Sequence, residues 1–328
     1  GGYKMKKSKR VLSLVLSVVL AFSFLVSCSN SKTQSTDDSK KSYKIAVLLP
    51  GPTGYFVATK EGIDKTAKEL GVNIEYADAQ WDSSKQMSQA EDFISKGVDL
   101  IALCAVDASG AEKIVKAAND SKVPILAFTN SIGTDPTGKY DGLVSYVGQN
   151  EVNTGKVTGE IAKKLLGEKG GKAVLIEGVP GTSPQINRRK GVMEAIQGTN
   201  VDVVYTQTSN WKKEEALKIT EDLVQKKTAF DVIICQDDNS AIGAGQALKE
   251  AGMKDKVKVI GLGGSKDGLQ ALKDGLIDGT TYMSAVEEGS LAIKTAVKYL
   301  NKESVEPVTE IKQVEVNKEN VGSFKGEW

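Results

Sequence analysis

The chain has 328 residues, of which 40% are hydrophobic and 26% are charged, and 43 basic against 42 acidic side chains give a formal net charge of +1. This size and composition are typical of a soluble globular protein of about two domains, and the balanced charge gives no indication of nucleic-acid binding. The sequence has no histidine, which excludes Ser-His-Asp and Cys-His nucleophiles and histidine-ligated metal sites.

The N-terminal region has the pattern of an export signal. Basic residues between positions 4 and 10 precede an apolar stretch over residues 11–26, which is short for a membrane span. The stretch ends in Leu-Val-Ser-Cys, similar to a bacterial lipobox whose cysteine is diacylated, and a plain signal peptide with an incidental cysteine is the alternative. We predict a signal peptide over residues 1–27, lipidation of Cys28, a flexible tether over residues 28–42, and anchoring to the outer face of the cell membrane.

The first structured segment is expected at residues 44–56. Residues 45–49 are apolar at every position, which predicts a strand buried on both faces in a parallel sheet. Pro50 and Gly51 end this strand, and residues 57–70 have helical spacing. Ligands of open α/β sheets bind outside the carboxyl ends of the strands. Tyr55 and Phe56 would lie there, either in a ligand site or as core residues that close the end of the sheet.

Strand and helix patterns then alternate in two similar rounds. The segments that begin at Asp99 and Asp231 resemble each other, so we predict two doubly wound Rossmann-like α/β domains, each with a parallel sheet and right-handed crossovers. The first round has predicted strands at 72–77, 99–105, 123–128 and 143–147, with helices at 83–96, about 107–119 and 152–166. The second has strands at 173–176, 201–205, 231–235, 257–261 and 279–283, with helices ending near 196 and at 213–226, 240–251, 266–273 and 287–299.

The motifs that would indicate a cofactor are incomplete. Residues 133–139 approach a phosphate-binding loop, but Tyr140 stands where Ser or Thr must hold magnesium. Residues 261–264 are glycine-rich and lack the third spaced glycine of a dinucleotide fingerprint. We therefore predict no cofactor, no metal and no enzymatic activity.

Two residue pairs have alternative interpretations. Asp237 and Asp238 could do acid/base chemistry, but adjacent side chains at a strand end diverge, which favours a helix cap or ligand acceptor. Cys104 and Cys235 lie in apolar, strand-like runs, which favours buried free thiols, and a disulfide between them is the alternative.

Polar and aromatic side chains gather at the predicted carboxyl ends of the strands. Each alone could be a turn former, a cap or a solvated charge, but together they would suit a polyhydroxylated ligand, since aromatic rings cover C–H faces and polar groups bind hydroxyls. These residues are Thr129, Asn130, Gln149, Asn150, Arg188, Asn210, Trp211, Asp237 and Asp238.

Five segments make residues 43–316 similar to the type I periplasmic sugar-binding proteins, in particular the ribose-binding proteins. They read G-Y-F-V-A-T-K-E-G, V-P-I-L-A-F, G-T-S-P-Q-I-N-R-R-K-G, C-Q-D-D-N-S-A-I-G-A and V-I-G-L-G-G-S-K-D-G, starting at positions 54, 123, 181, 235 and 259. The resemblance implies two domains joined by a three-strand hinge that close on a ligand. It places one domain at residues 43–148 plus 284–311 and the other at 149–283 plus 312–328.

The resemblance also implies the ligand-binding residues. The stacking aromatics fall on Tyr55, Phe56 and Trp211, and the polar contacts fall on Gln149, Arg188 and Asp237. The chain departs from the family pattern at Cys104, Thr129, Asn130, Gly263 and Met283, so carboxylates that hold sugar hydroxyls are replaced and a less hydroxylated or differently arranged ligand is favoured. Trp81 and Trp328 are expected to lie away from the site.

The resulting functional prediction is a monomeric lipoprotein that delivers a sugar, a polyol or a related molecule to an ABC transporter permease. The alternatives are a sensor module for a chemoreceptor or membrane kinase and a receptor for a furanose-like signal molecule. An enzyme is disfavoured by the absent histidine, and a sugar-responsive repressor by a signal peptide in place of a DNA-binding motif.

Overall fold

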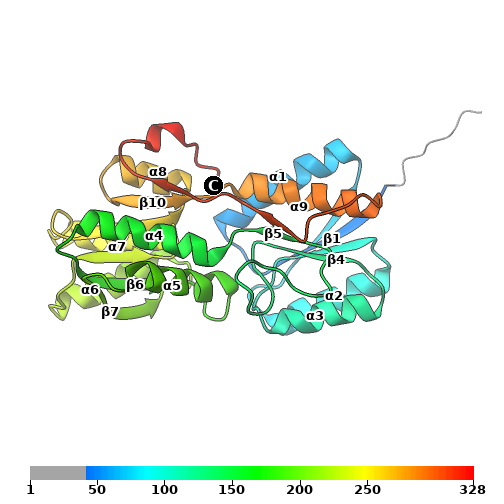
Figure 1. Ribbon diagram of the computed structural model, residues 1–328, viewed down its shortest axis with the longest axis horizontal. Coiled ribbons are helices and arrows are strands. Elements are labelled where there is room, and N and C mark those ends of the chain that lie inside the picture. Colours follow the sequence, from blue (N-terminus) through cyan, green and yellow to red (C-terminus); the bar gives the residue numbers. More distant parts are fainter. Residues whose placement is uncertain (1–41) are drawn as a thin grey trace, which may run out of the picture. The chain divides into compact units, whose positions relative to one another are not determined.

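The computed structural model describes residues 42–328, which contain two α/β domains (Figure 1). The predicted signal peptide, Cys28 and all but the last residue of the tether lie outside the described residues. Within residues 42–328, no helix is both long and apolar enough to cross a membrane.

The first domain is built on a wholly parallel six-stranded sheet in the order β11-β5-β4-β3-β1-β2. Alternate residues of β1 face opposite layers: Ile45 and Val47 pack toward α1 and α9, whereas Ala46 and Leu48 pack toward α2 and α3. Burial on both faces explains why this strand is apolar at every position. The elements are β1 (Lys44–Leu49), α1 (Gly54–Leu70), β2 (Asn73–Asp78), α2 (Ser83–Lys96), β3 (Leu100–Leu103), α3 (Gly110–Asp120), β4 (Ile125–Phe128), β5 (Tyr146–Gly148), α9 (Ala285–Leu300) and β11 (Val308–Glu310).

The second domain repeats this plan in the order β12-β10-β9-β8-β6-β7. Helices α4 and α5 pack on one face of the sheet, and α6, α7 and α8 pack on the other. The predicted parallel sheet is present in β7, β6, β8, β9 and β10, and the edge strand β12 adds to it by running antiparallel to β10. The elements are α4 (Glu151–Leu166), β6 (Gly171–Glu177), α5 (Ser183–Ile196), β7 (Val201–Thr208), α6 (Lys213–Gln225), β8 (Val232–Cys235), α7 (Asp238–Glu250), β9 (Lys258–Gly263), α8 (Lys266–Lys273), β10 (Gly279–Tyr282), β12 (Val314–Val316) and the short 3₁₀ helix η1 (Val321–Ser323).

The chain passes between the two domains three times. It leaves the first sheet after β5, returns from β10 into α9, and crosses again from β11 to β12. The predicted three-strand hinge is therefore present, while the residue boundaries assigned to the domains remain a prediction. In a doubly wound sheet the ligand binds at the carboxyl ends of the strands, where the strand order reverses.

Two local features of the fold bear on the site. Helix α1 begins at Gly54 rather than at the predicted residue 57, because Thr53 Oγ1 accepts a hydrogen bond from the Phe56 amide and caps the helix. Tyr55 and Phe56 therefore stand in its first turn. Cys104 and Cys235 are free, buried thiols in the cores of different domains, as the apolar sequence around each favoured.

Candidate functional site

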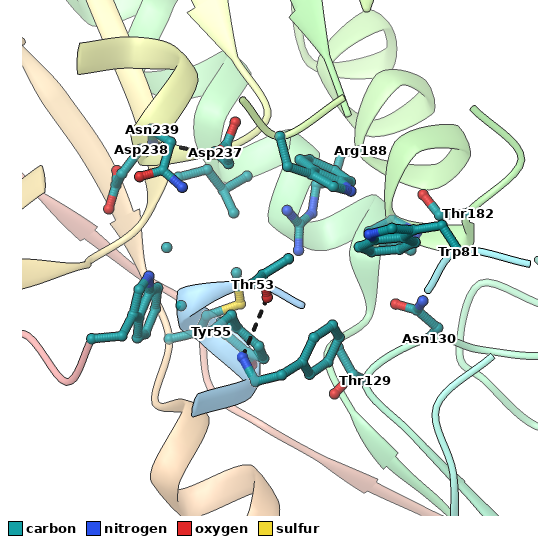
Figure 2. Close-up of a pocket in the computed structure, with 18 residues that line it drawn as sticks. Thr53, Tyr55, Trp81, Thr129, Asn130, Thr182, Arg188, Asp237, Asp238 and Asn239 are labelled. Carbon is teal, nitrogen blue, oxygen red and sulfur yellow. Dashed lines mark hydrogen bonds between the residues drawn. The ribbon is translucent and has the colours of Figure 1, made fainter. Parts of the chain in front are cut away.

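A cavity of about 90 Å³ lies where residues from the carboxyl ends of both sheets meet (Figure 2). Figure 2 shows Arg188, Thr182 and Asp237 on one side and Tyr55, Thr53 and Thr129 on the other. The lining residues are Thr53, Gly54, Tyr55, Phe56, Trp81, Thr129, Asn130, Thr182, Pro184, Arg188, Trp211, Asp237, Asp238, Asn239, Leu262, Gly263, Met283 and Trp328.

Five aromatic side chains line the cavity: Tyr55, Phe56, Trp81, Trp211 and Trp328. The Tyr55 ring meets Phe56 edge-on at a centroid distance of 5.8 Å and Trp328 at 5.0 Å. The expectation that Trp81 and Trp328 lie away from the site is wrong. Such rings offer flat apolar surface to the C–H faces of a small ring or polyol.

Trp81 and Trp211 are presented by the same turn in the two domains. Trp81 follows β2 and Trp211 follows the equivalent strand β7, and each tryptophan and the residue before it have φ between 54° and 64°. Consecutive non-glycine residues with positive φ are uncommon and strained. Each indole lies against a glycine that follows a central strand, because a Cβ on Gly51 or Gly178 would come within 2.3 or 1.8 Å of indole atoms. The similar sequences Gln-Trp and Asn-Trp before α2 and α6 could have revealed Trp81.

Arg188 lies on α5 with its guanidinium held by the protein. Its Nε and Nη2 donate to the two oxygens of Glu151 at 2.7 and 2.8 Å, and Nη1 donates to the Gln236 carbonyl at 2.8 Å. Burial lowers the pKa of Arg188, but the charge and hydrogen bonds of Glu151 outweigh it, so the pKa is raised. Three of the five N–H groups are used in these bonds, which leaves two for a ligand. Arg188 is also only 7% exposed, so its removal would leave Glu151 buried and unpaired.

The two aspartates that follow β8 have different surroundings. Asp237 caps α7 by accepting hydrogen bonds from the amides of Asn239 and Ser240, as the helix-cap interpretation predicted. Burial, assisted by the nearby Asp238 charge, raises the pKa of Asp237 to about 6. Asp238 accepts from the Ser265 amide and the Thr280 hydroxyl, each at 2.7 Å. Both aspartates line the cavity, and Asp238 also joins β10 to the residue that caps α8.

A buried polar network lies behind Tyr55. The Tyr55 hydroxyl donates to Glu288 Oε2 at 2.9 Å and accepts from Gln149 Nε2 at 3.0 Å, and the Thr129 hydroxyl donates to Glu288 Oε2 at 2.6 Å. Burial raises the pKa of Glu288 to about 8, and the Glu151 charge adds to this. Within residues 42–328, Oε1 of Glu288 and Oε1 of Gln149 are buried without a hydrogen-bond partner. The network joins α1, β4, the first crossing and α9.

The structure brings most of the predicted ligand-binding residues together. Cys104 and Gln149 do not line the cavity; both are buried behind it and could influence a ligand only through the residues in front. Glu151 and Glu288 were missed, since nothing in the local sequence indicates their distant partners. Asn150 and Asn210 do not line the cavity either. The predicted residues that line the cavity are Tyr55, Phe56, Thr129, Asn130, Arg188, Trp211, Asp237, Asp238 and Met283.

Within residues 42–328, no cluster of three or more His, Cys, Asp or Glu side chains is placed to hold a metal ion. The cavity instead combines stacking surfaces with a few hydrogen-bonding groups. That combination is typical of binding sites for small molecules.

Comparison with known proteins identifies the family. The model of the periplasmic binding protein domain matches residues 45–304. The chain belongs to this family of solute-binding proteins. The ribose import binding protein of Bacillus subtilis is 32% identical over 305 residues, which cover 91% of this chain and 95% of the relative. A putative rhizopine-binding protein of Rhizobium meliloti is 33% identical over 276 residues, which cover 81% of this chain and 87% of the relative.

Solved structures of the family agree with the fold. An ABC transporter solute-binding protein from Bacillus halodurans with bound myo-inositol has a TM-score of 0.81 and 28% identity, and the match covers 86% of this chain and 96% of that chain. The resemblance to type I periplasmic sugar-binding proteins is confirmed.

Proposed function

We propose that this periplasmic binding protein captures one sugar, polyol or related hydroxylated molecule between its domains and delivers it to an ABC importer. The observation that carries the proposal is one cavity lined from both domains by five aromatic rings together with Arg188 and Asp237. The rings provide faces for C–H groups, and the guanidinium and carboxylate bind hydroxyls. The names of its relatives refer to ribose import and rhizopine binding, and one similar structure holds myo-inositol, which supports a ligand of this size.

Ligand binding can be tested with a thermal-shift screen of pentoses, hexoses, inositols and linear polyols, followed by calorimetry of each hit. A true ligand at one hundred times its Kd should stabilise the folded protein by about 2.7 kcal/mol. Turnover of a bound ligand would contradict a pure binding role. Failure of every sugar and polyol to raise the Tm would contradict the ligand class.

We further propose that Cys28 is diacylated and anchors the protein outside the cell. Two acyl chains on one cysteine meet the requirement for stable membrane attachment, and the apolar stretch before Cys28 has the pattern of a signal peptide. Fractionation of a Cys28→Ala variant tests this proposal. Release of the variant into the soluble fraction is expected, and membrane retention equal to that of the wild type would contradict the anchor.

A further inference from the structure

The segment 324–328, which we call the strap, is docked against the hinge end of α9. The Glu327 carboxylate accepts hydrogen bonds from the Ser284 hydroxyl at 2.6 Å and from the Val286 amide at 2.9 Å. Ser284 is also the N-cap of α9, so Glu327 binds where the chain passes from β10 into that helix. An anionic side chain is stabilised at a helix N-terminus. The strap is therefore fixed at one of the three crossings between the domains.

This docking places Trp328 against both domains. Its carbonyl accepts a hydrogen bond from the Lys266 amide at 2.8 Å, and its indole meets the Tyr55 ring at 5.0 Å. The indole also occupies space that glycines leave open: a Cβ on Gly54 would lie 2.8 Å from Cδ1, and one on Gly263 would lie 3.0 Å from Cζ2. Figure 1 shows the C-terminal end of the ribbon between the labels of α8 and α1.

Part of the cavity wall beside Trp328 is apolar. Leu262 and Met283 line the cavity and belong to one hydrophobic cluster, against which Tyr55 packs. Asp238 is a polar neighbour of Trp328, since its Oδ2 lies 3.5 Å from the position of a Cβ on Gly263, but both of its carboxylate oxygens already accept hydrogen bonds, from the Ser265 amide and the Thr280 hydroxyl. The wall formed by Leu262, Met283, Tyr55 and Trp328 is thus suited to carbon-bound hydrogens, because an unpaired hydroxyl against it would lose hydrogen bonds to water.

We propose that Trp328 is a specificity-determining residue that selects ligands with a CH₂ or CH₃ group, rather than a hydroxyl, at this wall, and that Glu327 positions it. This inference rests on the proposed function and narrows the ligand class to deoxy or otherwise partly reduced sugars and polyols. The selectivity arises because the apolar wall penalises a buried hydroxyl that finds no partner.

The test of selectivity compares ligands that differ by one oxygen: D-ribose with 2-deoxy- and 5-deoxy-D-ribose, and L-galactose with L-fucose. Calorimetry of the wild type should show a preference of at least fivefold for a deoxy member over its partner. In Trp328→Ala the ratio should fall to about one and the affinity for the deoxy sugar should drop about tenfold, whereas Trp328→Phe should keep part of the preference. Lys325→Ala is the matched control, since this strap side chain is exposed.

Positioning by Glu327 can be tested without a ligand. In a Trp81→Phe/Trp211→Phe background, Trp328 is the remaining tryptophan of the chain. Adding Glu327→Ala should at least double acrylamide quenching of its fluorescence, and adding Lys325→Ala should not change it. Unchanged quenching in Glu327→Ala would overturn the positioning role.

The outcomes separate the two proposals. A wild type that prefers the hydroxylated member of every pair, or a Trp328→Ala variant that keeps the deoxy preference, overturns the selectivity while the sugar-binding function stands. A wild type that binds none of these sugars and no member of the wider screen overturns the proposed function, and the selectivity with it.

Discussion

Arg188 is held in place before any ligand arrives, because Glu151 binds its guanidinium through both carboxylate oxygens. A ligand therefore meets a positioned donor group whose charge is already compensated. The ion pair fixes the position of the guanidinium. Because both side chains are buried, removing either one would leave the other charge without a partner and would destabilise the folded protein. The effects of mutation on binding and on folding must be measured separately.

Arg188→Met is expected to destabilise the protein by about 3–5 kcal/mol, because Glu151 would be left buried and unpaired. Arg188→Met/Glu151→Leu should recover most of that loss, since an apolar pair needs no compensating charge. Ligand affinity should stay at least tenfold weaker in both variants. Urea denaturation and calorimetry check this prediction. A double variant that binds as tightly as the wild type would show that Arg188 is structural only.

Glu288 should make the protein less stable as the pH rises. Burial raises its pKa to about 8 from an ordinary value of 4.5, so the folded state keeps a proton that the unfolded chain releases. The stabilisation is fully present below pH 4.5 and is lost progressively up to about pH 8. The Tm of the wild type should therefore fall from pH 5 to pH 8.5.

Glu288→Gln should show a smaller fall in Tm over this range, because its side chain does not titrate. The remaining fall includes Asp237, whose pKa is also raised. Glu91→Gln changes the same charge at an exposed position and is the control. Parallel pH profiles for wild type and Glu288→Gln would contradict the assignment.

The sequence predicts the positions of the helices and strands well, but it does not predict the side-chain contacts between distant elements. The helix at 266–273 was predicted at the residues where it is found, because Ser265 caps it locally. Glu151 binds Arg188, which is 37 positions away in the sequence. Glu288 binds Thr129 and Tyr55, which are 159 and 233 positions away. No local sequence pattern indicates contacts over such distances. The turn that contains Trp81 and the turn that contains Trp211 have similar sequences, so this repeat could be recognised from the sequence.

Two hydrogen bonds join the domains beside the cavity. The Ser131 amide, after β4, donates to the hydroxyl of Ser183 at the start of α5 at 2.8 Å, and the Ala108 amide donates to the Gly181 carbonyl at 3.4 Å. Both join a loop of the first domain to the turn before α5. These hydrogen bonds stabilise the arrangement in which residues of both domains line the cavity.

Ser183→Ala should weaken ligand binding about fivefold, because the buried Ser131 amide would lose its acceptor when the domains are together but could bind water when they are apart. The expected change is mainly a faster dissociation rate, which stopped-flow fluorescence can measure. Ser88→Ala removes a hydroxyl that bonds only within α2 and should have no effect. An unchanged dissociation rate in Ser183→Ala would show that this contact does not contribute.

Ligand binding should be coupled to closure of the two domains. Residues of both domains line one cavity, so a ligand that contacts both favours the closed arrangement. Solution scattering should show a smaller radius of gyration with ligand than without. Tight binding with no compaction would contradict closure.

Domain closure on ligand binding should change the fluorescence of three tryptophans rather than of one. Trp81, Trp211 and Trp328 all line the cavity, so each single Trp→Phe variant should lose only part of the ligand-induced change. The triple variant should lose it. Retention of the full signal in all three single variants would place the ligand elsewhere.

The threefold passage of the chain between the domains determines the order in which the protein can fold. The first sheet needs β11, residues Val308–Glu310, as its edge strand, and it needs α9 to cover one face, yet both follow the elements from α4 to β10 of the second domain in sequence. Its pairing of Tyr146 with Val308 closes a very long loop, and such non-local contacts form slowly. A chain that emerges N-terminus first therefore keeps its first domain incomplete until nearly all of it has appeared.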